Sequence, residues 1–495
     1  MKIVKILGLY CFLTFGVYAQ QNATVSGRLT DEGQTVANRT IRIVSATQTY
    51  ETTTDENGNY RFENVPDGNY LLVFNNKQAS VTVKNGEVSI ASLAEIVVIS
   101  ANATQTIDEV SKTVNIIDGQ ELRDRADFTL AETLRTIPGF RVQQLGGFGR
   151  TASVKTRGLR NQDTAVLIDG IRFRDASSIT GDASAFLSDF TLTSVSRIEV
   201  LRGSGSSLYG TNAIGGAIDF QTPKPPTGWH GQIGGAFGGY GLGRFRGNLS
   251  NGTKDGKFGF NLGVSRTVYT KGIDGEDDAH NTNFQSRIEY NPFSKTNISG
   301  RFFISDAYVR LNSSPDTIGT PPTSAASVID AIPLSREELR RYETGTPISQ
   351  LIRGNANFIP DANDADNFQK SKFYNGQVFL TQIFNDKLVF QGFYQGLKTS
   401  RKNTDGVLGI GFQPFGGSQT YFFDGQIHTA SGILNWTPFS NNQVKIGYEY
   451  EWEKFGNNGA FVNAANNFST RARQSSNTVY IQDLLSFYND KLKFS

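Results

Sequence analysis

Histidine, cysteine and closely spaced carboxylates are the residue types in this 495-residue chain that would bind a metal or carry covalent catalysis. His230, His280 and His428 stand far apart, and Cys11, the one cysteine, lies in the N-terminal apolar stretch. A zinc site needs several such ligands, and a catalytic triad needs a nucleophile beside a base. No local motif of either kind occurs, although residues distant in sequence can meet in a fold. We therefore predict no catalytic residues, no metal, no cofactor and no enzymatic activity.

Two short polar stretches have the residue types of ligand-binding loops, but each lacks the residue that would complete it. The glycine–serine stretch 203–207 is not followed by the Lys-Ser or Lys-Thr pair of a phosphate-binding loop. Asp55, Asn57 and Asn59 have the spacing of a calcium loop without its later bidentate glutamate. We predict neither nucleotide nor calcium binding, and an Asx-type turn at Asp55.

Three carboxylates at alternate positions, Glu449, Glu451 and Glu453, form the clearest polar row of the chain. The residues between and before them are apolar, which predicts a β-strand with one polar and one apolar face. Unpaired charges are too costly to bury in a dry core, so this row must face water or a partner. The same alternation occurs at 258–265 and 284–290. A soluble sandwich also alternates, but apolar-out and polar-in pairs are typical of an outer-membrane barrel.

Composition favours a β-rich protein that does not bind nucleic acid. The chain contains 52 glycines and 12% aromatic residues, which suit strands and turns better than helices. Its 48 basic residues nearly balance 46 acidic ones. Nucleic-acid binding needs a basic surface that neutralises phosphates, and the balanced charge argues against one.

The N-terminus predicts a cleaved export signal at residues 1–19. Lys2 and Lys5 precede an apolar stretch that ends at Ala19, a small residue of the kind that a signal peptidase accepts. The alternative is a membrane anchor, but the apolar run is shorter than the roughly 20 residues of a spanning helix. Cleavage removes the one cysteine, so we expect no disulfides. Any membrane crossing by the rest of the chain must use strands.

Residues 22–93 have the pattern of short strands separated by turns, with turn signals at 55–58 and 66–68. The pattern VSGRL, TIRI and TTTDENGNYRFENVPDGNYLL resembles the carboxypeptidase-regulatory-like domain, a small β-sandwich without catalytic residues. The resemblance implies a binding or spacer module.

The most specific motifs lie within residues 107–223. They are LAETLRTIPGFRV at 130–142, VKTRGLRNQDTAVLIDGIRF at 154–173 and SRIEVLRGSGSSLYGTNAIGGAIDFQTP at 196–223. Their order and spacing resemble the plug domain of TonB-dependent outer-membrane receptors. Local physics is consistent with this resemblance, because Leu130, Leu134 and Ile137 fall on one face of a predicted helix that the following Pro-Gly pair ends.

The segment 95–101, between the sandwich and the plug, predicts an extended strand. Its position resembles the TonB box, which adds a strand to an energy-transducing periplasmic partner through main-chain hydrogen bonds. The alternative is the last strand of the sandwich. The residues that the resemblance assigns to the partner contact are Glu95, Ile96, Val97, Val98, Ile99, Ser100 and Ala101.

The plug resemblance also implies roles for charged residues. The residues expected to hold the plug to the barrel wall are Arg157, Glu199, Arg202 and Glu449. In this family the ligand meets the outward plug loops, which here are 143–150 and 172–182. Arg150, Arg172 and Arg174 are therefore candidate anchors for an acidic ligand. The alternatives are solvated surface charges for the first group and a polar lumen lining for the second.

Residues 229–495 predict ten antiparallel strands, with an eleventh beginning at Lys491. Short turns alternate with long connections, and the long ones are expected at 269–281, 306–371, 398–419 and 454–474. The family barrel has twenty-two strands, so the resemblance implies the first half of a barrel in a truncated chain. Such an open sheet has edges that lipid does not tolerate, so this product is expected to aggregate, whereas residues 22–222 alone are expected to be soluble. The expected fold is mainly β: a small β-sandwich, an α+β plug domain and half of an antiparallel transmembrane β-barrel.

The resemblance implies a receptor in the outer membrane of a Gram-negative bacterium that takes up a scarce nutrient. The plug motifs are most similar to receptors for siderophores or cobalamin. The implied partners are a TonB-type periplasmic energy transducer, outer-membrane lipid and a small-molecule ligand such as a ferric siderophore or cobalamin. The alternative is a surface-binding or signalling receptor that does not transport.

Overall fold

The chain divides into two compact units, and the boundary between them lies at Ala94 and Glu95. In its described segments no helix is both long enough and apolar enough to cross a membrane. The computed structural model describes residues 22–494 except 32–33, 36–37, 46–47, 75–76, 85–86, 91–93, 98–104, 107–111, 206–208, 272–276, 312–331, 353–356, 360–365, 386, 407–417, 440–441 and 488–491.

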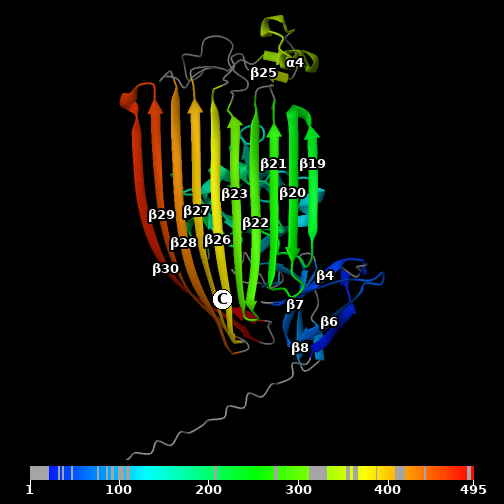
Figure 1. The fold of residues 1–495 in the computed structure, drawn as a ribbon. Coiled ribbons are helices and arrows are strands. Elements are labelled where there is room, and N and C mark those ends of the chain that lie inside the picture. Colours follow the sequence, from blue (N-terminus) through cyan, green and yellow to red (C-terminus); the bar gives the residue numbers. More distant parts are fainter. Residues whose placement is uncertain are drawn as a thin grey trace, which may run out of the picture. The chain divides into compact units, whose positions relative to one another are not determined.

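The N-terminal unit is a small β-sandwich, coloured blue in Figure 1. Its strands are β1 (Asn22–Arg28), β2 (Thr30–Asp31), β3 (Gln34–Thr35), β4 (Thr40–Val44), β5 (Thr49–Thr53), β6 (Asn59–Pro66), β7 (Gly68–Phe74), β8 (Lys77–Lys84) and β9 (Glu87–Ile90). β1 pairs with β6, while β8, β7, β4 and β5 are neighbours in a second sheet. Alternate residues such as Ile41 and Ile43 are completely buried between the sheets, which confirms the predicted sandwich.

The turn before β6 is an Asx turn, as its sequence predicts. Oδ1 of Asp55 accepts hydrogen bonds from the backbone N–H groups of Asn57 at 2.9 Å and Asn59 at 2.8 Å. The side-chain amide of Asn59 donates to the other carboxylate oxygen at 2.9 Å. Gly58 has φ of 78°, a conformation that favours glycine. The carboxylate is thus used by the turn itself.

The plug is an α+β domain at the start of the second unit. Its elements are β12 (Thr113–Asp118), α1 (Gly119–Asp124), α2 (Leu130–Leu134), β13 (Phe140–Gln144), β14 (Ala152–Thr156), η2 (Asn161–Asp163), β15 (Thr164–Ile168), β16 (Ile171–Phe173), η3 (Ser184–Asp189), β17 (Arg197–Arg202), η4 (Thr211–Ala213) and β18 (Gly216–Gln221). The main sheet has the order β12-β17-β18-β15-β16, and β13 and β14 form a separate hairpin. β15 and β18 run parallel, whereas the other pairs of the sheet are antiparallel.

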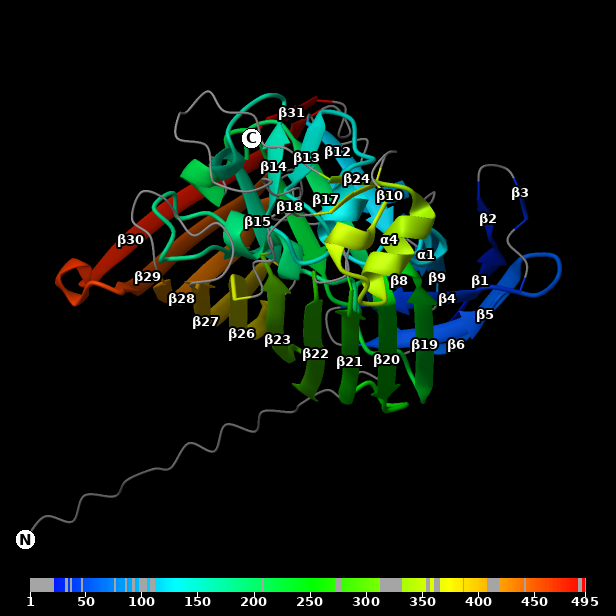
Figure 2. The same cartoon turned by 90° about the horizontal axis from the view of Figure 1, so that it is seen from above.

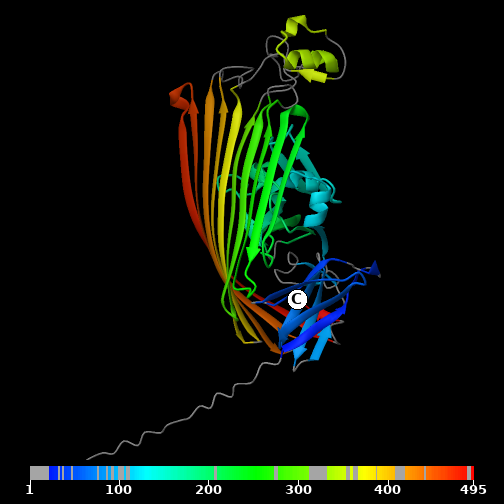
Figure 3. The same ribbon diagram turned by 45° about the vertical axis from the view of Figure 1, so that its right-hand side comes forward.

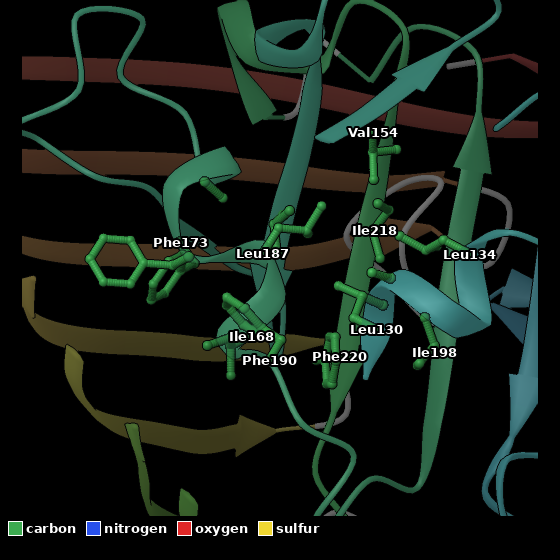
Figure 4. Packing of buried hydrophobic residues seen from close by; sticks show 14 of the residues in the cluster. Leu130, Leu134, Val154, Ile168, Phe173, Leu187, Phe190, Ile198, Ile218 and Phe220 are labelled. Carbon is green, nitrogen blue, oxygen red and sulfur yellow. The ribbon is translucent and has the colours of Figure 1, made fainter. Parts of the chain in front are cut away.

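Helix α2 begins at a capping box and packs its apolar face into the plug core. The Thr129 hydroxyl accepts from the Glu132 backbone N–H, and the Glu132 carboxylate accepts from the Thr129 N–H. Leu130 and Leu134 are completely buried, and Figure 4 shows them beside residues of β17 and β18. Leu130 and Leu134 form the predicted apolar face, but the helix ends at Leu134, so the buried Ile137 and the Pro-Gly pair lie beyond it.

An antiparallel sheet of eleven strands follows the plug (Figures 1 and 3). Its strands are β19 (His230–Gly238), β20 (Leu242–Gly252), β21 (Phe258–Tyr269), β22 (Ala279–Phe293), β23 (Thr296–Arg310), β26 (Phe368–Asn385), β27 (Leu388–Asp405), β28 (Gln419–Phe439), β29 (Asn442–Phe461), β30 (Phe468–Phe487) and β31 (Leu492–Phe494), and the turn η5 (Gly239–Gly241) joins the first two. The prediction of ten strands and the beginning of an eleventh is confirmed. The sheet is curved, and the plug lies on its concave side (Figure 2).

The predicted long connections are shorter than the sequence suggests, because the strands continue into them. β27 runs on to Asp405, and β29 runs on to Phe461. The main chain of these largely polar stretches stays paired with the neighbouring strand. Strand pairing depends on main-chain groups rather than on apolar side chains, so a polar sequence does not end it.

The inner face of the sheet carries four apolar residues that break the polar-in pattern. Phe303 on β23, Phe373 on β26, Leu397 on β27 and Ile427 on β28 are all at most 3% exposed and belong to the apolar cluster of the plug. The Phe373 ring lies 5.4 Å from that of Phe190 in the plug. The plug core therefore extends onto the sheet.

The connection between β23 and β26 contains its own small folded unit. β24 (Ile332–Leu334) pairs with β25 (Asn357–Ile359), and between them lie α4 (Arg336–Glu343) and η6 (Ile348–Gln350). Ser335 caps α4 by accepting from the Glu338 backbone N–H at 3.1 Å.

Candidate functional site

A row of ion pairs joins the plug to the concave face of the sheet. Nη2 of Arg174 lies 2.7 Å from a carboxylate oxygen of Glu451, and the same guanidinium also contacts Glu453. Arg172, on β16, reaches Glu451 at 3.6 Å and Glu449 at 4.0 Å. The three glutamates alternate along β29 and therefore all face the plug. We call these five residues the ion-pair ladder.

The ladder explains how three carboxylates are accommodated on one strand face. The side chains of Arg174, Glu451 and Glu453 are 15%, 11% and 9% exposed, so each charge is largely removed from water. A buried carboxylate needs a paired cation and hydrogen bonds to offset its desolvation. The two arginines supply both. The sequence prediction that the glutamate row faces a partner is consistent with this arrangement, and the partner is the plug.

Two buried aspartates provide a second set of plug–sheet contacts. Asp175 lies 3.3 Å from Arg401 on β27 and accepts a hydrogen bond from the Thr399 hydroxyl at 2.9 Å. Asp189, on η3, accepts a hydrogen bond from the Ser371 hydroxyl on β26 at 2.6 Å. Burial raises the pKa of Asp189 to about 7. The sequence analysis did not select either aspartate, because neither belongs to a local motif.

A tight turn of the plug docks on β23. Asp169 and Gly170 have φ of 51° and 83°, as in the type I′ turns that Asp-Gly favours. The Asp169 carboxylate lies 3.4 Å from Arg301 on β23 and accepts hydrogen bonds from the Thr222 backbone N–H and hydroxyl. The Gly170 N–H donates to Asp219 at 3.0 Å. This turn thus links β15, β18 and the sheet.

Asp219 is the basis of a pH prediction for the plug. Burial, followed by the charge of its cross-strand partner Glu199, raises the pKa of Asp219 from 3.8 to about 8. Between those values the folded plug keeps a proton that the unfolded chain releases. The free energy of unfolding should therefore fall as pH rises from about 4 to about 8. Asp219→Asn preserves the acceptor for Gly170 and should flatten this slope.

The measurement is chemical unfolding of residues 22–222 at pH 5 and pH 8.5. The wild-type fragment is expected to lose stability at the higher pH more steeply than the Asp219→Asn fragment. Asp118→Asn is the matched control, because Asp118 lies at the end of β12 and is only partly buried. Equal slopes for wild type and Asp219→Asn would contradict the assignment.

A pocket of about 310 Å³ lies between the tip of the β13–β14 hairpin and the ends of the sheet strands. Arg150, from the hairpin tip, lies 2.9 Å from Asp277, and Phe148 stacks on Tyr269 with ring centres 5.2 Å apart. Tyr240 completes the aromatic part of the lining. The pocket combines a cation, carboxylates and aromatic rings, a combination that suits a planar or acidic small molecule.

A second pocket of about 400 Å³ adjoins the ion-pair ladder. Arg172 and Arg174 line one side, the loop 178–181 and Asn212 line another, and residues of β29 and β30 complete it. The sequence prediction placed both arginines in a ligand site. In the structure their guanidinium groups are paired with the ladder glutamates, so a ligand role for them stays a prediction.

Comparison with known proteins places these features in a family. Residues 106–217 match the TonB-dependent Receptor Plug Domain, and residues 24–131 match the Carboxypeptidase regulatory-like domain. The matched plug region contains the hairpin tip, the Asp169-Gly170 turn and the arginines of the ladder. Residues 106–217 are thus a plug domain of the type found in TonB-dependent receptors.

Curated proteins similar to this chain include two vitamin B12 transporters named BtuB. The protein from Vibrio cholerae is 40% identical over 129 residues, which are 26% of this chain and 20% of the relative. The protein from Photobacterium profundum is 34% identical over 133 residues, which are 27% of this chain and 21% of the relative. The matched region is thus about a fifth of the length of these relatives.

Several solved receptor structures share the fold of this chain. The FpvAI–pyocin S2 complex has a TM-score of 0.62 at 12% identity, covering 83% of this chain and 58% of that chain. The ferripyoverdine receptor of Pseudomonas aeruginosa has a TM-score of 0.61 at 12% identity, covering 83% and 56%. The ferric citrate transporter FecA has a TM-score of 0.57 at 17% identity, covering 77% and 55%.

The other charged residues that the family resemblance selected make contacts inside the plug of this receptor. Glu199 is completely buried and lies 2.7 Å from Arg197. Arg202 donates to the Pro138 carbonyl at 3.2 Å, and Arg157 occupies an exposed turn with φ of 51°. Glu449 lies near Arg172 rather than near Arg157 or Arg202. The barrel-wall role of Arg157, Glu199 and Arg202 stays a prediction.

The segment predicted to bind the energy transducer begins in a strand. Glu95, Ile96 and Val97 belong to β10 (Ala94–Val97), which pairs with β11 (Gln105–Thr106). Both interpretations of this segment therefore stay predictions. Val98, Ile99, Ser100 and Ala101 lie outside the described residues, as does the predicted signal peptide 1–19.

Proposed function

We propose that this protein is an outer-membrane receptor for energy-coupled uptake of a scarce small molecule, a ferric siderophore or a cobalamin-like ligand. The observation that carries the proposal is the seating of the plug against the polar face of the sheet by the ion-pair ladder and the two buried aspartates. Together these ion pairs and hydrogen bonds hold the plug firmly, but each one can be replaced by contacts with water. A plug held in this way can be displaced by pulling.

The sequence supports the remaining parts of the proposal. A cleaved signal at residues 1–19 would export the chain of a Gram-negative bacterium to the outer membrane. A TonB-type partner would then bind at residues 95–101 by strand addition. The pocket at the hairpin tip lies at the strand ends that carry the long connections, the end that faces outward in outer-membrane barrels. It is our candidate ligand site, with Arg150 as the anchor for an acidic group.

Growth under ligand limitation tests the proposal. Deletion of the gene should slow growth when one siderophore or cobalamin is the sole source of iron or of the vitamin, and it should abolish uptake of the labelled ligand. Uptake should return with the wild-type gene. Binding of the labelled ligand without uptake by the wild-type cell would favour the alternative, a receptor that does not transport. Neither binding nor uptake of any ligand in the panel would contradict the proposal.

Arg150→Gln should weaken binding of that ligand by at least about tenfold, because a charge-assisted hydrogen bond contributes about 1.5–3 kcal/mol. Arg141→Gln is the matched control, since Arg141 is an exposed arginine of the same hairpin outside the pocket lining. Binding to purified full-length receptor by titration calorimetry makes the comparison. Equal affinities for the two variants would place the ligand elsewhere.

A further inference from the structure

Two lysines and three aromatic rings form a cluster across four adjacent strands of the sheet. Tyr308, Lys370, Lys402 and Phe422 are successive cross-strand partners on β23, β26, β27 and β28. Nζ of Lys370 lies 5.9 Å from the centre of the Tyr308 ring and 5.4 Å from that of Phe368. Nζ of Lys402 lies 5.8 Å from the Phe368 ring and 5.4 Å from the Phe422 ring. We call these five residues the lysine–aromatic row.

The row lies on the convex face of the sheet, away from the plug. Ser371, next to Lys370, points inward and donates to the plug residue Asp189. Arg401, next to Lys402, also points inward and pairs with Asp175. Successive side chains of a strand point to opposite faces, so both lysines point outward.

Among the residues that the structure describes, no ion pair balances the charges of the row. Lys370 and Lys402 stand directly opposite each other, an arrangement that destabilises a sheet when both side chains carry the same charge. No carboxylate of the described residues lies within 4.0 Å of either ammonium group. By contrast, Lys372, one step further along the same face, pairs with Asp306 at 2.7 Å. Asp424 stands opposite Ser400 rather than opposite either lysine of the row. The row therefore suits an anionic partner from outside the chain.

The position of the row along the strands indicates which kind of anion it would contact. Lys370 is the third residue of β26, and Lys402 is three residues before the end of β27. At ~3.3 Å per residue, the row lies roughly 10 Å from the strand ends that carry the long connections. Below it the same face becomes apolar, with Val378 and Leu380 at 48% and 38% exposed. A lysine facing lipid costs ~2–4 kcal/mol at the bilayer midplane but almost nothing at the interface.

We propose that the lysine–aromatic row binds the phosphates of a phosphorylated glycolipid head group in the outer leaflet of the membrane. This inference rests on the outer-membrane location in the proposed function. One phosphate between the two ammonium groups would neutralise their repulsion and accept hydrogen bonds from both. The aromatic rings hold the ammonium groups by cation–π contact and offer flat apolar faces to the sugar and the upper acyl chains.

The test is lipid binding to full-length receptor folded in detergent, followed by native mass spectrometry. The probes are lipid A with both phosphates and the same lipid after enzymatic removal of its phosphates. Wild type is expected to bind the diphosphorylated lipid at least about tenfold more tightly than the dephosphorylated form. The double variant Lys370→Ser/Lys402→Ser is expected to lose this preference.

Two control variants distinguish a specific phosphate site from a general effect of positive surface charge. Lys254→Ser removes an exposed lysine from the turn at the opposite end of the strands and should leave the preference unchanged. Lys370→Arg/Lys402→Arg retains both charges and should retain the preference. A shift between heated and unheated samples in gel electrophoresis shows that each variant is folded.

Equal binding of the two lipids by wild type would overturn the inference, and so would an unchanged preference in a folded serine variant. If the serine variant does not fold, the inference is tested by comparing the binding of the two lipids to the wild-type protein. Absence of the full-length protein from the outer-membrane fraction would instead contradict the proposed function. A receptor that inserts and transports without a phosphate preference would contradict this inference alone.

Discussion

Cells in which Ile96 or Val98 of the receptor is replaced by proline are expected to lose uptake completely while binding ligand at their surface as well as wild-type cells do. Proline lacks the backbone N–H and fixes φ, so it prevents an added strand from pairing at that residue. The candidate ligand pocket lies at the hairpin tip of the plug and does not include these residues. Binding and accumulation of labelled ligand, measured on the same cells, separate the two steps.

This experiment needs a control because Ile96 on β10 is paired with Thr106 on β11. Ile96→Pro therefore also removes a donor from a strand of the protein itself. Ile96→Ala is the matched control, since it shortens the side chain but retains the N–H, and it should transport. Retention of the purified receptor on an immobilised periplasmic domain of the transducer gives an independent readout. Normal uptake by both proline variants would remove residues 95–101 from the partner contact.

Reversing one charge of the ion-pair ladder should unseat the plug. Glu451→Lys places a cation beside Arg172 and Arg174, whose side chains are 28% and 15% exposed. Breaking a buried ion pair by leaving its partner unpaired costs about 3–5 kcal/mol, and the added repulsion acts in the same direction. We expect a lower melting temperature of the full-length receptor and entry of large antibiotics that the outer membrane normally excludes.

Glu449→Lys is the graded control for this prediction. Glu449 is 4.0 Å from Arg172 and 27% exposed, so its pair is weaker and better screened, and its reversal should have a smaller effect. Adding Arg174→Glu to Glu451→Lys restores a pair of opposite charges and should recover part of the lost stability. The ladder would have no seating role if Glu451→Lys matched wild type in both melting and antibiotic exclusion.

Local patterns in the sequence are sufficient to predict much of this fold. The alternation from Lys445 to Glu453 determines which side chains of β29 share a face, because the period of a strand is two residues. The Thr129–Glu132 spacing marks the start of α2, because a capping box involves only residues three apart. The Asp55 turn is local in the same sense. In each of these, the interacting groups are within a few residues of one another.

The partners across the plug–sheet interface were decided by the tertiary structure. Arg174 and Glu451 are 277 positions apart in the sequence, and Asp175 and Thr399 are 224 positions apart. Such pairings depend on the register of every intervening strand, since a slip of one residue turns each side chain to the other face. The inward-facing Phe373 depends on register in the same way. Its ring packs against the rings of three plug residues, Phe173, Phe186 and Phe190. The sequence by itself therefore determined which side chains of β29 share a charged face, and the fold alone determined which charge each of them meets.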